Sequence, residues 1–281
     1  FFEAASCSSH AVGCQGPASA SQLRAGLPSA VALPAAGKVP VKLYGMAGCP
    51  FTRAFIEGPL SETVAVVPEM IDLDFVTFGN CYYAMDGCGA PPDVPPPFAS
   101  FWHGYDQGAR QCWDMRCGAV SRGPAENCFR GELLCQHGVT DGMVTTSWAC
   151  AVERSGGNFS SYMPFVACTA ERFLGIVDEA SFNKTVLDCA SAGGFSAGGT
   201  RGPARELLEC AAGAHGRSLL NAQGRRTIMH PGVPYVTVDG EVLDDVRCVA
   251  CGDGIMQKVC EAWRRRAGAV PPVCEALFGV S

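Results

Sequence analysis

Short strand-like runs and helical spacing alternate along the chain. Residues 39–46 (VPVKLYGM) form a β-rich run, and Pro50 follows it where a helix would place its first residue. Residues 51–57 continue that helix, and residues 71–78 predict a second strand. Because a helix that links two strands places them parallel, residues 39–80 predict a β-α-β unit.

The second half of the chain is dominated by apolar residues at helical spacing. This spacing predicts helices over residues 143–153, 163–173, 176–189 and 204–214.

A different pattern closes the chain. Residues 233–238 predict a strand, Asp239-Gly240 is a hairpin turn signal, and residues 241–243 begin the return strand. Residues 254–266 predict a final helix, with Ile255, Val259 and Trp263 on one face.

Two segments lack any clear period. Residues 1–38 are rich in Ala, Ser, Gly and Pro, which is typical of a tail or linker. Residues 81–130 contain five cysteines and a proline-rich run at 91–97. We interpret them as a disulfide-held insertion whose proline run is a rigid loop rather than a polyproline ligand.

These patterns divide the chain into five parts. They are a tail (1–38), a β-α-β half (39–80), the Cys/Pro-rich insertion (81–130), a helical insertion (131–225) and a β-β-α half with a C-terminal tail (226–281). Without the two insertions, the order of elements is that of an α/β protein with a thioredoxin-like fold. The remaining parts are then a helical insertion subdomain and an extra Cys-rich loop insertion.

Composition narrows the function classes. The chain has 281 residues, 48% of them hydrophobic and 17% charged, with a formal net charge of −6. An acidic chain lacks the electrostatic footprint for nucleic acid or an anionic membrane. We also expect no transmembrane helix, because no run of apolar residues is long enough.

Cysteine content gives the strongest compositional signal. The chain has 17 cysteines, and this density is typical of a disulfide framework formed in an oxidising compartment. The odd number leaves at least one thiol unpaired within the chain. Sequons at Asn158 and Asn183 predict glycosylation and agree with passage through the secretory pathway.

A second C-x-x-C motif lies at Cys248–Cys251. Structural half-cystines are the favoured interpretation because the predicted compartment is oxidising. A redox shuttle and a zinc site are the alternatives, and zinc would need two further ligands. We therefore expect no metal and no cofactor.

Cys49 is the candidate nucleophile. It follows the first predicted strand and begins the first predicted helix, where free amides and the helix dipole stabilise a thiolate. The alternative is that Cys49 is one more half-cystine.

Several motifs together resemble the gamma-interferon-inducible lysosomal thiol reductase family. The segments are Val41–Tyr44 with Cys49-Pro50-Phe51-Thr52, Cys135-Gln136-His137-Gly138 with Cys150, Met163–Cys168 and Val233–Gly240. The resemblance covers residues 39–80 and 131–274. It implies a thioredoxin-like fold, thiol–disulfide exchange on protein disulfides, and a lysosomal or other lumenal or extracellular location. It also implies that Pro234 is a cis proline beside the substrate site.

The chain departs from the family pattern at four positions. Thr52 stands where the family has the second cysteine of C-x-x-C, Asp141-Gly142 replaces Glu-Cys, and Thr145 replaces Asn. In a dithiol reductase the second thiol releases the product from the mixed disulfide, and a threonine cannot do this. The Thr52 hydroxyl is expected instead to donate a hydrogen bond to the Cys49 thiolate.

Two further residues are candidates for the site. Cys81 follows the second predicted strand and so should lie at the same sheet edge as Cys49. We hypothesise that it is a partner for Cys49, although anchoring the insertion is the simpler role. His137 either tunes a nearby thiol or serves as a structural hydrogen bonder.

Two functions remain open. The first is thiol–disulfide exchange by a single active-site cysteine, Cys49, with weak or lost reductase activity. The second is a non-catalytic structural or interaction subunit, assembled through the N-terminal tail or the 81–130 insertion. A secreted carbohydrate- or peptide-binding module has only the aromatic residues of 98–113 to support it.

Overall fold

The computed structural model describes residues 37–89, 98, 105–117, 128–192, 195, 202–243, 253–269 and 271–279. The predicted N-terminal tail, the proline run at 91–97 and the Cys248–Cys251 motif lie outside these residues, apart from the last two tail positions.

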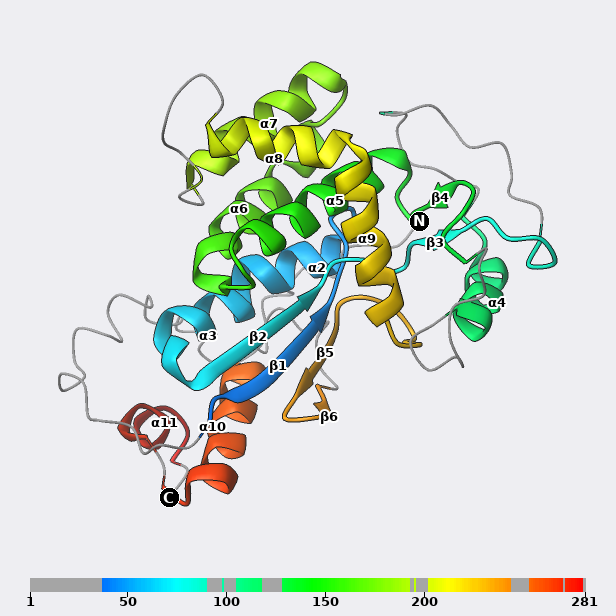
Figure 1. Ribbon diagram of the computed structural model, residues 1–281. Coiled ribbons are helices and arrows are strands. Elements are labelled where there is room, and N and C mark those ends of the chain that lie inside the picture. The colour runs from blue at the N-terminus through cyan, green and yellow to red at the C-terminus, as the bar shows by residue number, and fades with distance from the viewer. Residues whose placement is uncertain are drawn as a thin grey trace, which may run out of the picture. The chain divides into compact units, whose positions relative to one another are not determined.

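The described part of the chain contains a mixed four-stranded sheet in the order β2-β1-β5-β6 (Figure 1). Strands β1 (Val39–Tyr44) and β2 (Ile71–Val76) run parallel. Strand β5 (Tyr235–Val238) is antiparallel to β1, and β6 (Glu241–Val242) is antiparallel to β5. The predicted strands and the predicted parallel pair are confirmed.

One helical segment connects β1 to β2. It comprises α2 (Pro50–Phe55), the π-helical turn Ile56–Leu60 and α3 (Ser61–Val66), and a 3₁₀ turn at Pro68–Met70 leads into β2. Pro50 occupies the first helical position, as expected, because that position needs no amide hydrogen.

Five helices form the block between the two halves of the sheet. They are α5 (Val139–Arg154), α6 (Phe159–Glu171), α7 (Glu179–Ala192), α8 (Pro203–Ala212) and α9 (Ala214–Arg226), with a 3₁₀ turn at Phe173–Gly175. Figure 1 shows them grouped together on one side of the sheet. Within the core, Phe75 of β2 packs against Trp148 and Tyr162, with ring centroids 5.6 and 6.5 Å away.

The predicted helices are present but their ends differ, and α5 begins at Val139 rather than at residue 143. α6 begins at Phe159 rather than residue 163, because Asn158 caps it by accepting a hydrogen bond from the amide of Ser160. α9 lies in the predicted helical insertion but was not predicted as a separate helix, since its polar sequence does not give a clear apolar stripe.

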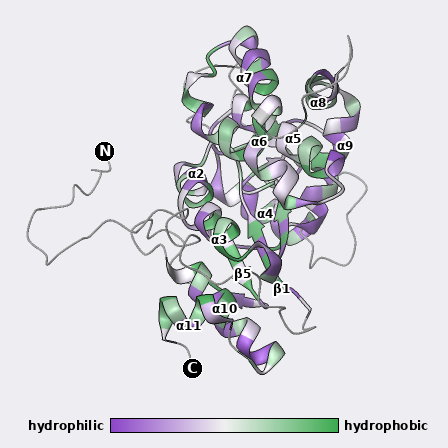
Figure 2. Cartoon of the chain, turned by 90° about the vertical axis from the view of Figure 1, so that its left-hand side faces the viewer, coloured by the Kyte–Doolittle hydropathy of each residue, from purple (hydrophilic) through white to green (hydrophobic). Residues whose placement is uncertain are grey.

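The C-terminal helices are α10 (Asp253–Ala267) and α11 (Pro272–Phe278), joined by the Cys260–Cys274 disulfide. The predicted apolar face of α10 is confirmed, because Ile255, Val259 and Trp263 are all buried. Figure 2 shows hydrophilic residues elsewhere on α10. The prediction placed a tail where α11 lies.

The Cys-rich insertion is confirmed as disulfide-held. It contains β3 (Tyr82–Tyr83) and α4 (Gln107–Cys117), and β3 pairs with β4 (Leu133–Leu134). Its disulfides are Cys81–Cys135, Cys88–Cys112 and Cys117–Cys128. The ladder and the first disulfide close the insertion at residue 135, five residues beyond the predicted boundary.

A buried charged cluster fastens α4 to the segment before β5. Arg110 and Asp114 form an ion pair, with Nη2 and Oδ2 3.1 Å apart, and both side chains are almost completely buried. Arg110 also lies 3.2 Å from Nε2 of His230. Burial and then the Arg110 charge lower the pKa of His230 to about 3, while burial raises the pKa of Asp114 to about 6.

We predict that His230 makes stability depend on pH in the mildly acidic range. The unfolded chain protonates His230 near pH 6.5, whereas the folded chain excludes that proton until about pH 3. The stability from neutral His230 is therefore full above pH 6.5 and lost as the pH falls, at up to about 1.4 kcal/mol per pH unit.

The contribution of His230 to stability is measured by urea unfolding of the wild type and of His230→Gln between pH 7 and pH 4. The stability advantage of the wild type should shrink as the pH falls. Asp114 acts in the opposite direction, but it is present in both proteins and cancels in the difference. A constant difference across this range would contradict the prediction.

Candidate functional site

Cys49 lies in the loop that follows β1 and is the N-cap of α2. It is in no disulfide, and the residue is only 5% exposed. Its Sγ donates a hydrogen bond to the carbonyl oxygen of Val233 at 3.3 Å. The thiol is thus free but shielded, and it faces the segment that leads into β5.

Val233 immediately precedes Pro234, and the peptide bond between them is cis. Tyr235, the next residue, begins β5 opposite Tyr44 at the end of β1. The ladder therefore brings Pro234 to the sheet edge where Cys49 lies, as the sequence predicted.

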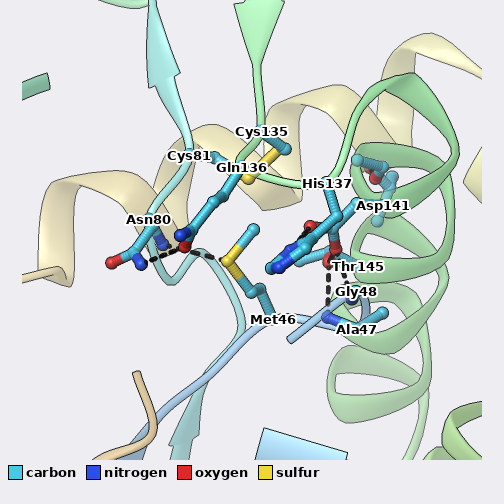
Figure 3. Close-up of a disulfide and its surroundings, with 12 residues drawn as sticks. Met46, Ala47, Gly48, Asn80, Cys81, Cys135, Gln136, His137, Asp141 and Thr145 are labelled. Atoms are coloured by element: carbon cyan, nitrogen blue, oxygen red, sulfur yellow. Dashed lines mark hydrogen bonds and ion pairs between the residues drawn. A yellow bond between two sulfur atoms is a disulfide. The ribbon is translucent and has the colours of Figure 1, made fainter. Parts of the chain in front are cut away.

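A buried carboxylate fixes the loop before Cys49 (Figure 3). Asp141 of α5 is fully buried, and its Oδ1 accepts hydrogen bonds from the amide of Gly48 at 2.6 Å and from the hydroxyl of Thr145 at 3.2 Å. Thr145 Oγ1 in turn accepts a hydrogen bond from the amide of Ala47 at 3.1 Å. Two successive loop amides are therefore bound by one turn of α5.

Gly48 is required for this contact. A Cβ at this position would lie 2.6 Å from Asp141 Cγ and from His137 Cβ. No flexible side-chain end could move aside to relieve both contacts, so the loop approaches α5 this closely only with glycine. The guanidinium of Arg53 adds a third tie, donating to the Gly48 carbonyl at 3.2 Å.

His137 belongs to the same network. Its Nδ1 lies 3.1 Å from Asp141 Oδ2, and the two side chains are neighbours in Figure 3. Of the two predicted roles for His137, this contact supports that of a structural hydrogen bonder. Asp141 and Thr145 were not predicted as site residues, although the sequence marked both as departures from the family pattern.

Thr52 does not play its predicted part. Its side chain is completely buried, but its hydroxyl oxygen has no hydrogen-bond partner, so the expected bond to Cys49 is not formed. The methyl group of Thr52 packs against Gly45. A Cβ on residue 45 would lie only 2.8 Å from that methyl group. Thr52 is therefore a core residue beneath the loop before Cys49, and it does not donate a hydrogen bond to the Cys49 sulfur.

Cys81 is not a partner of Cys49, and this hypothesis is corrected. Cys81 forms a disulfide with Cys135. The reason is the β3–β4 register, which pairs Tyr82 with Leu134 and so sets residues 81 and 135 opposite each other. Asn80 and Gln136 continue the pairing through a side-chain hydrogen bond of 2.6 Å (Figure 3). Cys81 anchors the insertion, the alternative that the sequence left open.

The two sequons differ in accessibility. Asn158 is exposed at the start of α6, whereas Asn183 is half-buried on α7 and its sequon threonine, Thr185, is buried. Asn158 is thus the better placed of the two for a glycan.

Comparison with known proteins does not identify a family. The sequence matches no protein-family model, and no curated protein matches it significantly.

The described cysteines define the redox setting. Besides the four disulfides already named, Cys150 pairs with Cys210 and Cys168 with Cys189, so six disulfides lie in the described residues. Such a framework fits an oxidising compartment.

The described residues contain no group of three His, Cys, Asp or Glu side chains placed to hold a metal ion. None of the helices described is long and apolar enough to cross a bilayer.

We predict that Asp141→Ala destabilises the protein by about 3 kcal/mol, because it leaves the Gly48 amide and the Thr145 hydroxyl without their buried acceptor. Urea unfolding without reductant measures the loss. The matched control is Asp188→Ala, which removes an exposed carboxylate from its contacts with Arg172 and Lys184 and should cost much less, because solvent screens surface ion pairs. Equal losses for the two variants would refute the role of Asp141 in fixing the loop.

Proposed function

We propose that the chain is a thiol–disulfide exchange protein with a thioredoxin-like fold, in which Cys49 is the nucleophile. The sheet order β2-β1-β5-β6, with one parallel and two antiparallel pairings, supports the fold. The motifs that resemble the gamma-interferon-inducible lysosomal thiol reductase family support the activity.

One observation carries the proposal. Cys49 is an unpaired thiol among cysteines that are otherwise joined in disulfides in the described residues, and its sulfur lies 3.3 Å from the carbonyl of Val233, next to Pro234. A substrate chain beside Pro234 would present its disulfide to this sulfur.

The chemistry is a single exchange step. The Cys49 thiol gives its proton to solvent, and the thiolate attacks one sulfur of a substrate disulfide. A new disulfide joins Cys49 to the substrate, and the second substrate sulfur leaves as a thiolate. Thr52 has no thiol to break this mixed disulfide. An external thiol must do so, which favours isomerisation or covalent capture over autonomous reduction.

The burial of Cys49 favours a second candidate, a non-catalytic structural or interaction subunit. A residue that is 5% exposed meets a substrate disulfide only after local opening of the loop or of the segment before Pro234. If that opening does not occur under native conditions, the thiol is only a core residue.

Trapping of the mixed disulfide distinguishes the two candidates. We predict that the native protein, incubated with a peptide disulfide and without reductant, gains the mass of one peptide half on the tryptic fragment containing Cys49. The Cys49→Ser variant should lose this adduct. Absence of an adduct in the native wild type, with adduct formation only after addition of urea, would favour the non-catalytic subunit.

A second prediction concerns turnover. Thr52→Cys places a thiol one helical turn after Cys49, where it can attack the mixed disulfide. With dithiothreitol as the reductant, this variant should reduce a protein disulfide at least about tenfold faster than the wild type. The double variant Cys49→Ser, Thr52→Cys is the control and should be inactive. Equal rates for Thr52→Cys and the wild type would contradict the assignment of residue 52 as the missing resolving position.

A further inference from the structure

A cavity of about 500 Å³ lies between α4 and the segment before β5. Gln107, Gln111, Asp114 and Met115 line it from α4, and Met229, His230 and Pro231 line it from the facing segment. Its volume falls within the range of small-ligand sites. It is built partly by the Cys-rich insertion, a part of the chain that the exchange chemistry does not use.

The segment that forms one wall of the cavity leads to the Cys49 site. His230 stacks on Tyr235 and also contacts Tyr44, with ring centroids 5.8 and 5.9 Å away. The same segment continues to Val233, whose carbonyl accepts the hydrogen bond from Cys49. Four residue steps separate Met229 from Val233, and an extended chain covers at most about 14 Å in that distance. A peptide bound at Cys49 could therefore reach the cavity.

The side chains of the cavity suit a polypeptide. The carboxamides of Gln107 and Gln111 each offer a donor and an acceptor, as the backbone of an extended chain requires. Met115 and Met229 are 65% and 56% exposed, and flexible thioethers adapt to apolar side chains of different shape.

Charge disfavours an acidic occupant. The residues described as lining the cavity include no Lys or Arg, so the carboxylates of a small acidic thiol such as glutathione would find no cation there. Asp114 is buried in the wall, and its Oδ2 accepts no hydrogen bond although it lies beside Arg110. An acidic side chain would meet this carboxylate in the wall rather than a cation.

We propose that this cavity is a subsite for an extended polypeptide, which holds an apolar residue about four positions from the substrate cysteine that Cys49 attacks. The proposal rests on the proposed exchange function and adds a preference for polypeptide over small disulfides.

The test compares two reagents with one leaving group. The first is a peptide of about ten residues whose central cysteine is joined to 2-nitro-5-thiobenzoate, with Leu four positions away. The second is 5,5′-dithiobis(2-nitrobenzoate), which has no peptide. In both reactions the Cys49 thiolate forms a disulfide and releases the coloured thiolate, and Cys49→Ser gives the background. A peptide with Asp in place of Leu should react more slowly than the Leu peptide.

Two variants obstruct the cavity from opposite walls. Gln111→Trp and Met229→Glu change exposed side chains, so neither disturbs the core. Each should lower the ratio of the peptide rate to the small-reagent rate about tenfold. The matched control is Gln257→Trp, an exposed position on α10 that does not line the cavity, and it should keep the ratio. An unchanged ratio in both cavity variants would overturn the proposal.

Two further outcomes separate this proposal from the exchange function. If oxidised glutathione reacts as fast as the peptide and Gln111→Trp slows both alike, the occupant is a small thiol and the polypeptide subsite is wrong. If Cys49 reacts with no reagent, the exchange function fails. Binding of the S-methylated peptide to Cys49→Ser then decides the subsite. Binding that is weakened by Gln111→Trp supports the subsite, and no binding overturns it.

Discussion

The arrangement around Cys49 depends on one buried carboxylate. Asp141 accepts hydrogen bonds from the Gly48 amide and the Thr145 hydroxyl, and it contacts His137, from a position with no access to water. A buried acceptor without donors would be costly, so the loop amide and the carboxylate each require the other. This mutual requirement couples the helical block to the end of β1, although the two segments are 93 residues apart in sequence.

The Cys-rich insertion is stabilised differently. Its three disulfides and the short β3–β4 ladder hold a segment that has few regular elements among the described residues. The contact of Arg110 with His230 then joins it to the segment before β5. One wall of the cavity belongs to the insertion, and the other wall leads to Val233. The insertion therefore lies close to the segment that contacts Cys49, although none of its described residues bonds to the Cys49 sulfur.

The sequence predicted most of the architecture, because periodicity reports which positions are buried. It located the four sheet strands, the apolar face of α10 and the Cys49–Pro50 junction. It missed α9 and α11, whose patterns are weak, and it could not assign disulfide partners. The Cys81–Cys135 pair follows from the register of two-residue strands, and nothing in the local pattern of either strand shows that register. Asp141 was missed for a similar reason, since the contact between its helix and Gly48 depends on tertiary packing and leaves no local sequence pattern.

The interior around Gly142 suggests why Cys81 takes the place opposite Cys135. A Cβ at residue 142 would lie 3.4 Å from Cys135 Sγ, a spacing within reach of a direct bridge once a sulfur is added. Glycine occupies this position, so no sulfur is present there. Cys135 is instead bridged to Cys81, at the base of the insertion. Because a cysteine forms only one bridge, this pairing leaves Cys49 without a disulfide partner among the described cysteines.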